Sequence, residues 1–281
     1  MARIIGGMTS SHIPAVGNAY AKHLFEDPYW KPFFDGYPPI HKWLAEQKPD
    51  VAVVFYNDHG LNFFLDKMPT FAIGAAFEYE NQDEGWGIPV VGKFKGYPEL
   101  SWHIIEGAVA DGFDVCSCQE MAVDHGFTVP VQLFWGDQTK NPIKTIPICI
   151  NTVQHPIPTP MRCYRFGQAI GRAIASFPGD EKVVILGTGG LSHQLDGKRA
   201  GFINKEFDLK CMEKIVDEPE ELAAISTHDL IREAGAQGAE FILWLAMRGC
   251  LQGKVKRLHQ NYHIPISNTA AGTLLLENQT A

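Results

Sequence analysis

The sequence predicts an α/β protein: a single-domain, three-layer α/β sandwich in which a central mixed sheet is flanked by helices. Three observations support this fold class. Short, near-continuous runs of Val and Ile recur along the chain, as in strands that are buried on both faces. Stretches with helical spacing of apolar residues lie between these runs. Neither a repeat nor a linker divides the chain, so we predict one domain over residues 1–281.

Strand-like runs and helical stretches alternate in order along the chain. The predicted strands are ARIIGG (2–7), VAVVFYN (51–57), TFAIG (70–74), FDVCSCQ (113–119), IKTIPICIN (143–151) and KVVILGT (182–188). The predicted helices cover residues 99–112, 161–177, 205–216, 220–233 and 238–247. In the second of these helices Cys163, Phe166, Ile170 and Ile174 recur at helical spacing. The alternation favours a layered α/β architecture.

Composition narrows the classes of function. The chain has 32 Asp and Glu against 24 Lys and Arg, a net charge of -8, so it lacks the basic excess that binds nucleic acid phosphates. No apolar run approaches the ~20 residues that span a bilayer. The first residues show no signal or transit pattern, and the six cysteines include no CxxC pair. We therefore expect a cytoplasmic protein with reduced thiols and with neither a nucleic acid nor a membrane as partner.

Four of the eleven histidines follow strand-like runs. They are His12, His59, His125 and His193. Open α/β sheets place ligands beyond the carboxyl ends of their strands, so these side chains are candidates for one site. A single histidine in such a place is usually structural, because its ring nitrogens can bond to loop carbonyls. Four together favour metal binding and proton transfer, since imidazole is a common metal ligand and titrates near neutral pH.

An iron site of the two-histidine, one-carboxylate type also needs an Asp or Glu. Glu240 is the candidate, because its neighbours at helical spacing, such as Leu243 and Met247, are largely apolar and predict a buried face. A buried charge is costly unless it is paired or coordinated, so this position favours a ligand role. Its place near a helix start, where the dipole favours negative charge, is a structural explanation of equal weight. Asp58 and Asp124 each precede a histidine, and we predict turn or supporting roles for them.

Several longer motifs are similar to one enzyme family. They are SSHIP (10–14), YNDH (56–59), PTFAIG (69–74), DEGWG (83–87), VDHG (123–126), GTGGLSHQL (187–195), AGFINKEFD (200–208) and YHIPISNTA (262–270). Together they resemble the catalytic beta subunits of protocatechuate 4,5-dioxygenases, which belong to the class III, or type II, extradiol ring-cleaving dioxygenases. The resemblance extends over essentially the whole chain, and the joint occurrence of the motifs is more specific than any one of them.

The resemblance implies a metal site and a proton-transfer group. His12, His59 and Glu240 would hold a non-haem Fe(II), and His193 would be the acid/base histidine beside substrate and oxygen. In this chemistry the metal orients the catechol and O2, and a base of near-neutral pKa removes and returns a proton. His125 matches a further active-site histidine that contacts substrate or oxygen.

The resemblance also implies a substrate and a partner. Ser267 and Asn268 match residues that bind the ring carboxylate of protocatechuate, although SNT by itself suggests a loop or a helix cap. O2 would open the ring between C4 and C5 to give 4-carboxy-2-hydroxymuconate semialdehyde, in the catabolism of lignin-derived aromatic compounds. Gallate or another catechol acid is the alternative substrate. Gallate dioxygenases of the family include a fused helical region for which 281 residues leave no room, so we expect a separate small helical alpha subunit in an α2β2 assembly.

Three alternative functions can be compared with the dioxygenase interpretation from the residues alone. A zinc hydrolase or phosphatase could use the same histidines, because three protein ligands and one open position also suit catalytic zinc. A metal-free nucleotide-binding module could use GTGGLSH, but this stretch lacks the GK(S/T) ending of a phosphate loop and the third glycine of the dinucleotide motif. A non-catalytic relative would be expected to lack at least one of His12, His59, Glu240 or His193, and all of these are present.

Overall fold

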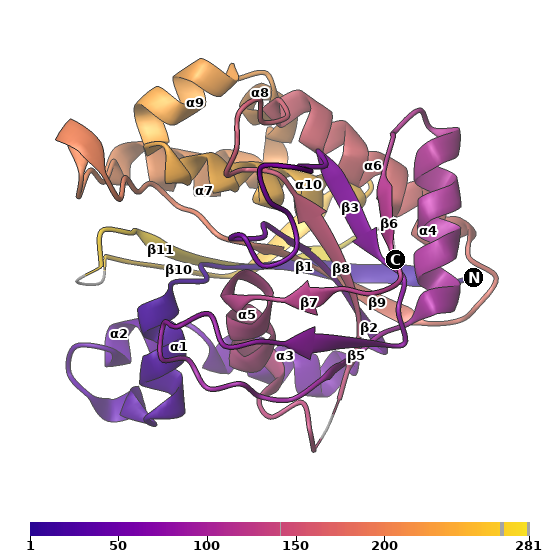
Figure 1. Ribbon diagram of the computed structural model, residues 1–281, viewed down its shortest axis with the longest axis horizontal. Coiled ribbons are helices and arrows are strands. Elements are labelled where there is room, and N and C mark those ends of the chain that lie inside the picture. The colour runs from indigo at the N-terminus through magenta and orange to yellow at the C-terminus, as the bar shows by residue number, and fades with distance from the viewer. Residues whose placement is uncertain (141, 265–266, 280–281) are drawn as a thin grey trace.

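A mixed eight-stranded sheet forms the middle layer of the computed structural model, which describes residues 1–140, 142–264 and 267–279 (Figure 1). Its strands lie in the order β10 (Val255–His263), β11 (Ala271–Asn278), β1 (Arg3–Ser10), β9 (Lys182–Thr188), β2 (Val51–Tyr56), β8 (Lys144–Ile150), β3 (Phe71–Gly74) and β6 (Cys116–Cys118). The central strands β1, β9, β2 and β8 are parallel, whereas β11 is antiparallel to β1 and β3 is antiparallel to β8. The predicted fold class is confirmed.

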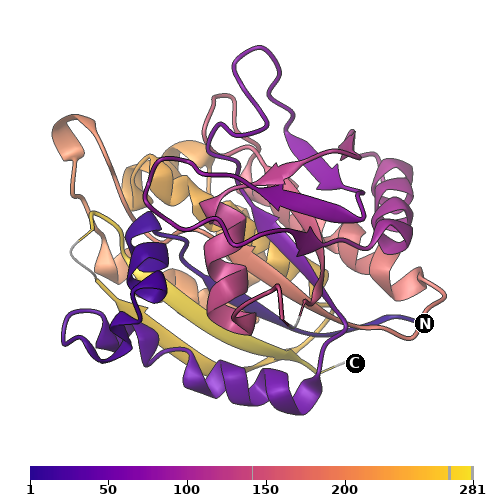
Figure 2. The same cartoon turned by 60° about the horizontal axis from the view of Figure 1, so that its bottom comes forward.

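Helices cover both faces of this sheet (Figures 1 and 2). On one face lie α1 (Pro14–Ala21), α2 (Lys31–Phe34), α3 (Pro38–Gln47) and α5 (His125–Trp135). On the other lie α4 (Pro98–Ala110), α6 (Pro160–Ser176), α7 (Lys205–Asp217), α8 (Pro219–Ala223), α9 (Thr227–Ala234) and α10 (Phe241–Cys250). Short 3-10 turns are η1 (Leu24–Glu26), η2 (Gly197–Arg199) and η3 (Gln237–Glu240). In the described part of the chain, no helix has the length and apolar character that crossing a bilayer requires.

The central strands separate two apolar cores. In β2 every residue is buried, and alternate side chains point to opposite faces. Val51, Val53 and Phe55 pack in the core beneath α6 and α10. Ala52 and Tyr56 pack in the core on the side of α3 and α5. This two-sided burial explains why the sequence of the strand is almost wholly apolar.

The structure adds elements to the predicted ones. A small sheet contains β5 (Phe94–Lys95), β4 (Glu78–Asn81) and β7 (Ala122–Val123), in that order. The antiparallel pair β10 and β11 and the helices α1, α2, α3 and α5 were not expected from the sequence. The helix predicted over 220–233 is divided into α8 and α9, because the Ser226 hydroxyl accepts a hydrogen bond from the Asp229 N–H and starts a new helix. All six cysteines are free, and Cys149, Cys163, Cys211 and Cys250 are buried, whereas Cys116 is exposed and Cys118 is partly buried.

Helices α6 and α10 approach each other through glycines. A side chain at Gly167 would overlap the carbonyl oxygen of Ala246, and one at Gly171 would lie 2.6 Å from the carbonyl oxygen of Cys250. Both partners belong to α10, which starts directly after Glu240. The close contact therefore fixes the helix that carries the candidate carboxylate.

Replacing Gly167 with Ala should lower the free energy of unfolding by about 1–3 kcal/mol, because the added methyl group overpacks this contact. Urea denaturation followed by circular dichroism measures the change. Arg165→Ala, at an exposed position of the same helix, is the control and should shift stability by less than about 0.5 kcal/mol. Equal stabilities for the two variants would contradict a tight α6–α10 contact at this point.

Candidate active site

Three of the predicted histidines lie beyond the carboxyl ends of neighbouring parallel strands. β1, β9 and β2 are adjacent in the sheet, and His12, His193 and His59 follow them within a few residues. Parallel strands end at the same edge of a sheet, so their loops meet there. His12 and His193 are buried, and the side chain of His59 is 25% exposed.

Glu240 lies among these three histidines. It ends η3 and directly precedes α10, and it is buried. One carboxylate oxygen, Oε2, is 3.4 Å from Nε2 of His12 and 3.8 Å from Nε2 of His193. The other, Oε1, is 3.8 Å from Nε2 of His59. Residues that are far apart in the sequence are thus brought to one point.

The second ring nitrogen of each histidine is bonded to a neighbour, which leaves Nε2 to face the carboxylate. Nδ1 of His12 is 3.2 Å from Oγ1 of Thr188. Nδ1 of His59 is 2.9 Å from Oδ2 of Asp124. A carboxylate that bonds one nitrogen fixes the orientation of the ring and raises the basicity of the other nitrogen. In neutral His59, the proton therefore lies on Nδ1.

His193 has a similar arrangement with a backbone partner. Its Nδ1 is 2.9 Å from the carbonyl oxygen of Leu191. Because a carbonyl can only accept, Nδ1 carries the proton, and Nε2 of the neutral ring is an acceptor. The imidazole is therefore held as a base that faces the space beside Glu240.

The aspartates next to the histidines have supporting roles, as predicted. Asp124 caps α5 by accepting the Gly126 N–H and also bonds the backbone and ring of His59. Asp58 accepts N–H bonds from the turn that follows it, including those of Gly60 and Leu61. Both carboxylates thus accept hydrogen bonds from the backbone around the histidines, and Asp124 also lies within 4.8 Å of possible ligand atoms of Glu84 and His125.

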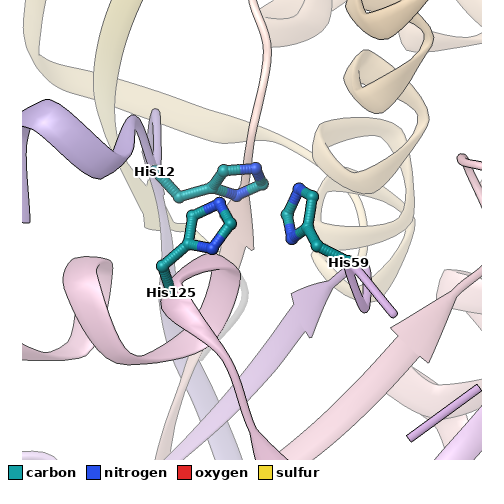
Figure 3. Close-up of side chains that lie close together, drawn as sticks. All are labelled: His12, His59 and His125. Carbon is teal, nitrogen blue, oxygen red and sulfur yellow. The ribbon is translucent and has the colours of Figure 1, made fainter. Parts of the chain in front are cut away.

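His125 joins the cluster from a different element. It begins α5, directly after β7 of the small sheet, and its ring stacks on that of His59 with 4.1 Å between centroids (Figure 3). Glu84 accepts hydrogen bonds from its backbone N–H and from Nδ1, at 2.6 and 2.8 Å. Burial, together with the nearby charge of His59, lowers the pKa of His125. Glu84 was not singled out from the sequence, although it lies in the DEGWG motif.

Two groups of side chains among the described residues could hold a metal ion, because their ligand atoms lie within 4.8 Å of one another. They are His12, His59 and His125, and Glu84, Asp124 and His125. The Nε2 atoms of His12 and His59 also face Glu240. Two imidazoles and one carboxylate are a donor set typical of non-haem iron, whereas three imidazoles are typical of zinc. The histidines present could hold a metal ion, and the carboxylate of Glu240 lies beside two of them.

Electrostatics favour a cation at this point. Burial alone would raise the pKa of Glu240, but the facing histidines outweigh it and hold the pKa well below its usual range. Burial lowers the pKa of His59, but Asp124 and Glu240 outweigh it and raise the pKa to about 10. The Glu240 carboxylate also accepts hydrogen bonds from Asn57 Nδ2, at 3.3 Å, and from the Gly190 N–H, at 2.9 Å. The site therefore stabilises the ionised Glu240 carboxylate, whose negative charge favours either protonated histidines or a metal ion beside it.

Ser267 and Asn268 lie in the segment between β10 and β11. The Ser267 hydroxyl is buried and has no hydrogen-bond partner among the residues that the structure describes. Thr269, which follows Asn268, pairs with the backbone of His193 in an antiparallel bridge. This segment is therefore adjacent to the His193 loop, although positions 265 and 266 of the YHIPISNTA motif lie outside the described residues.

The fold and the cluster define a class of protein: an α/β sandwich with a histidine- and carboxylate-lined metal site at the edge of its sheet. The family model described as the catalytic LigB subunit of aromatic ring-opening dioxygenase matches residues 6–272. The chain belongs to this family, whose members are class III extradiol dioxygenases. The predicted membership of the class III extradiol dioxygenases is confirmed. The narrower resemblance to protocatechuate 4,5-dioxygenase beta subunits, and protocatechuate as the substrate, remain predictions.

Individual relatives are similar over much of the chain. A gallate dioxygenase from Pseudomonas putida is 42% identical over 200 residues, which are 70% of this chain and 58% of that enzyme. The match thus spans less than two thirds of the relative. A 2,3-dihydroxyphenylpropionate/2,3-dihydroxicinnamic acid 1,2-dioxygenase from Rhodococcus jostii is 31% identical over 241 residues, 85% of this chain and 71% of that enzyme. The crystal structure of an uncharacterized protein from Escherichia coli K12 shares the fold, with a TM-score of 0.59, 11% identity and coverage of 96% and 99% of the two chains.

Gly189 provides a test of the metal site. Its φ is +76°, and a Cβ there would lie 2.6 Å from Oε2 of Glu240 and 3.0 Å from Cε1 of His12. Gly189→Ala should abolish metal retention, measured as bound metal after anaerobic loading with Fe(II) and gel filtration. Gly197→Ala is the matched control, because φ is +69° and nothing lies within 4 Å. Both variants carry a backbone strain of roughly 1–2 kcal/mol, but only the first should lose metal. Equal metal contents would contradict the site.

Proposed function

We propose that the chain, as one catalytic domain over residues 1–281, is an Fe(II)-dependent extradiol dioxygenase that opens protocatechuate between C4 and C5. The product is 4-carboxy-2-hydroxymuconate semialdehyde, in the catabolism of lignin-derived aromatic compounds. The observation that carries this proposal is the convergence of Nε2 of His12, His59 and His193 on the Glu240 carboxylate, in a chain whose family opens aromatic rings.

The proposed metal ligands are His12, His59 and Glu240. When bound, Fe(II) would orient the catechol and O2 and move electron density between them. We prefer Glu240 to His125 as the third ligand because two imidazoles and one carboxylate are the donor set of non-haem iron, and the Glu240 carboxylate lies between Nε2 of His12 and Nε2 of His59. His125 is then left beside the metal site, with its Nδ1 bonded to Glu84, and is proposed to contact substrate or oxygen.

His193 is the proposed acid/base group. Its ring is buried, its Nδ1 is tied to the Leu191 carbonyl, and its Nε2 faces the site. The Nε2 atom can take a proton from a catechol hydroxyl and return it when the ring opens.

Ser267 and Asn268 are proposed to bind the ring carboxylate. The Ser267 hydroxyl has no partner in the described structure, and a buried hydroxyl without a partner is costly unless a ligand completes it. Gallate, which differs from protocatechuate by one hydroxyl, is the second candidate substrate because the Pseudomonas putida relative is named a gallate dioxygenase.

A small helical alpha subunit in an α2β2 assembly is the proposed partner, and a cytoplasmic location is proposed with it. Exposed apolar side chains on loops near the site support a covering partner. They are Phe64, Leu65, Trp86 and Leu195. Because Trp86 lies 6.4 Å from His125 between ring centroids, such a partner would also contribute to the walls of the substrate site.

Oxygen uptake tests the function directly. Protein loaded anaerobically with Fe(II) should consume O2 with protocatechuate or gallate, and a candidate alpha subunit should increase the rate. Protein loaded with Zn(II) is the control and should be inactive. Turnover of protocatechuate by the zinc form without O2 would instead support a hydrolase.

His193→Ala should retain close to normal iron but lower turnover by about 10²-fold or more, as expected when a general base is lost. Iron content and the rate of oxygen uptake measure the two effects separately. His103→Ala, at a partly buried histidine of α4 outside the cluster, is the control. Loss of iron together with activity would make His193 a ligand rather than a base.

Ser267→Ala should raise the KM for protocatechuate several-fold and leave the KM for a catechol without a carboxylate unchanged. The reason is that only the carboxylated substrate would bond to the hydroxyl. Steady-state oxygen uptake with protocatechuate and 4-methylcatechol compares the two. Equal effects on both substrates would remove Ser267 from carboxylate binding.

A further inference from the structure

The AGFINKEFD motif ends at Asp208, a buried carboxylate outside the histidine cluster. Asp208 lies in α7 and is 1% exposed. Its Oδ1 accepts the Ser192 N–H at 2.9 Å, and its Oδ2 accepts the Ser192 hydroxyl at 2.6 Å and the Tyr262 hydroxyl at 2.9 Å. No ion pair joins it to a cation within the described part of the chain. Hydrogen-bond donors alone therefore compensate its burial.

The donors come from the two segments that the proposed reaction uses. Ser192 directly precedes His193, the proposed base. Tyr262 lies in β10, at the start of the segment that contains Ser267. One carboxylate thus contacts the proton-transfer loop on one side and the strand that leads to the proposed substrate-binding residues on the other.

These segments also pair with each other directly. The Leu191 N–H donates to the Ala270 carbonyl at 2.8 Å, and the Ala270 N–H donates to the Ser192 carbonyl at 3.0 Å. His193 and Thr269 form the adjoining antiparallel bridge. This short pairing has few hydrogen bonds of its own, so its register depends on side chains that hold both strands.

We propose that Asp208 is a positioning residue that holds the His193 loop and the segment containing Ser267 in one register. This inference rests on the proposed function. Asp208 then sets the distance between Nε2 of His193 and the hydroxyl of Ser267, although it contacts neither the substrate nor the metal in the proposed reaction. An error in this register would misplace either the base or the bound ring, and displacements of about 1 Å are enough to reduce rates strongly.

The chemistry of the contact requires a carboxylate. All three groups that meet Asp208 are donors, and an ionised carboxylate is an acceptor on both oxygens. An amide at this position keeps the shape but presents an NH2 group to two hydroxyls, so both would have to reorient. Burial raises the pKa of Asp208, and the Ser192 and Tyr262 hydrogen bonds act against this shift.

Steady-state kinetics separate the contact of Asp208 with Ser192 from its contact with Tyr262. With the Fe(II) enzyme and protocatechuate, Ser192→Ala should mainly lower kcat, because it loosens the His193 loop. Tyr262→Phe should mainly raise KM, because it loosens the segment of Ser267. Asp208→Asn should do both, by about tenfold each, with normal iron content. Adding Tyr262→Phe to Asp208→Asn should change little further, because the two share one interaction.

Hydrogen–deuterium exchange provides a readout that does not depend on activity. Asp208→Asn should increase exchange in residues 189–193 and in residues 267–272 together. Glu206→Gln, an exposed acid in the first turn of the same helix, is the matched control and should change neither exchange nor kinetics.

The outcomes are distinguishable. If the wild-type enzyme cleaves the ring but Asp208→Asn matches Glu206→Gln in kcat, KM and exchange, the positioning role is wrong. If the wild-type enzyme cleaves no catechol acid, the proposed function fails, while the exchange comparison still decides whether Asp208 couples the segments. If Asp208→Asn does not fold, the effects expected for Ser192→Ala, mainly on kcat, and for Tyr262→Phe, mainly on KM, decide. Equal effects on kcat and KM in both variants would overturn the proposal.

Discussion

The burial of one carboxylate, that of Glu240, is the constraint on which the rest of the site depends. A buried charge is stable only when other groups replace the water that it loses. Here three imidazoles, an amide and a backbone N–H surround it. These partners need space, and Gly189 leaves it by having no side chain. Gly189, one of the glycines before His193, therefore allows close packing around Glu240 and His12.

The topology of the sheet brings these groups together. β1, β9 and β2 are adjacent and parallel, so their loops deliver His12, His193 and His59 to one edge. Glu240 arrives from the other layer, on a helix fixed by its close contact with α6. Contacts to Nδ1 from Thr188, Asp124 and the Leu191 carbonyl then orient the three rings. Asp208 likewise holds Ser192, which directly precedes His193. A rigid scaffold thus positions polar groups that come from distant parts of the sequence.

The sequence predicted what depends on local patterns. The buried strands β2 and β9 are almost wholly apolar and were located to within a residue, and a histidine after a strand follows from chain order. β10 was missed because most of its residues are polar and partly exposed, so no apolar pattern marks it. The choice between ligand and helix-dipole explanations of Glu240 stayed open because it depends on distances across the fold. Glu84 and the network of Asp208 involve partners far apart in the chain, which periodicity cannot reveal.

The most direct test of the central claim is anomalous diffraction from crystals loaded with Fe(II) under anaerobic conditions. The account predicts one iron ion bound by Nε2 of His12, Nε2 of His59 and the carboxylate of Glu240, with His193 and His125 beside it but not coordinated. Iron held by His12, His59 and His125, with Glu240 apart from the metal, would contradict the account.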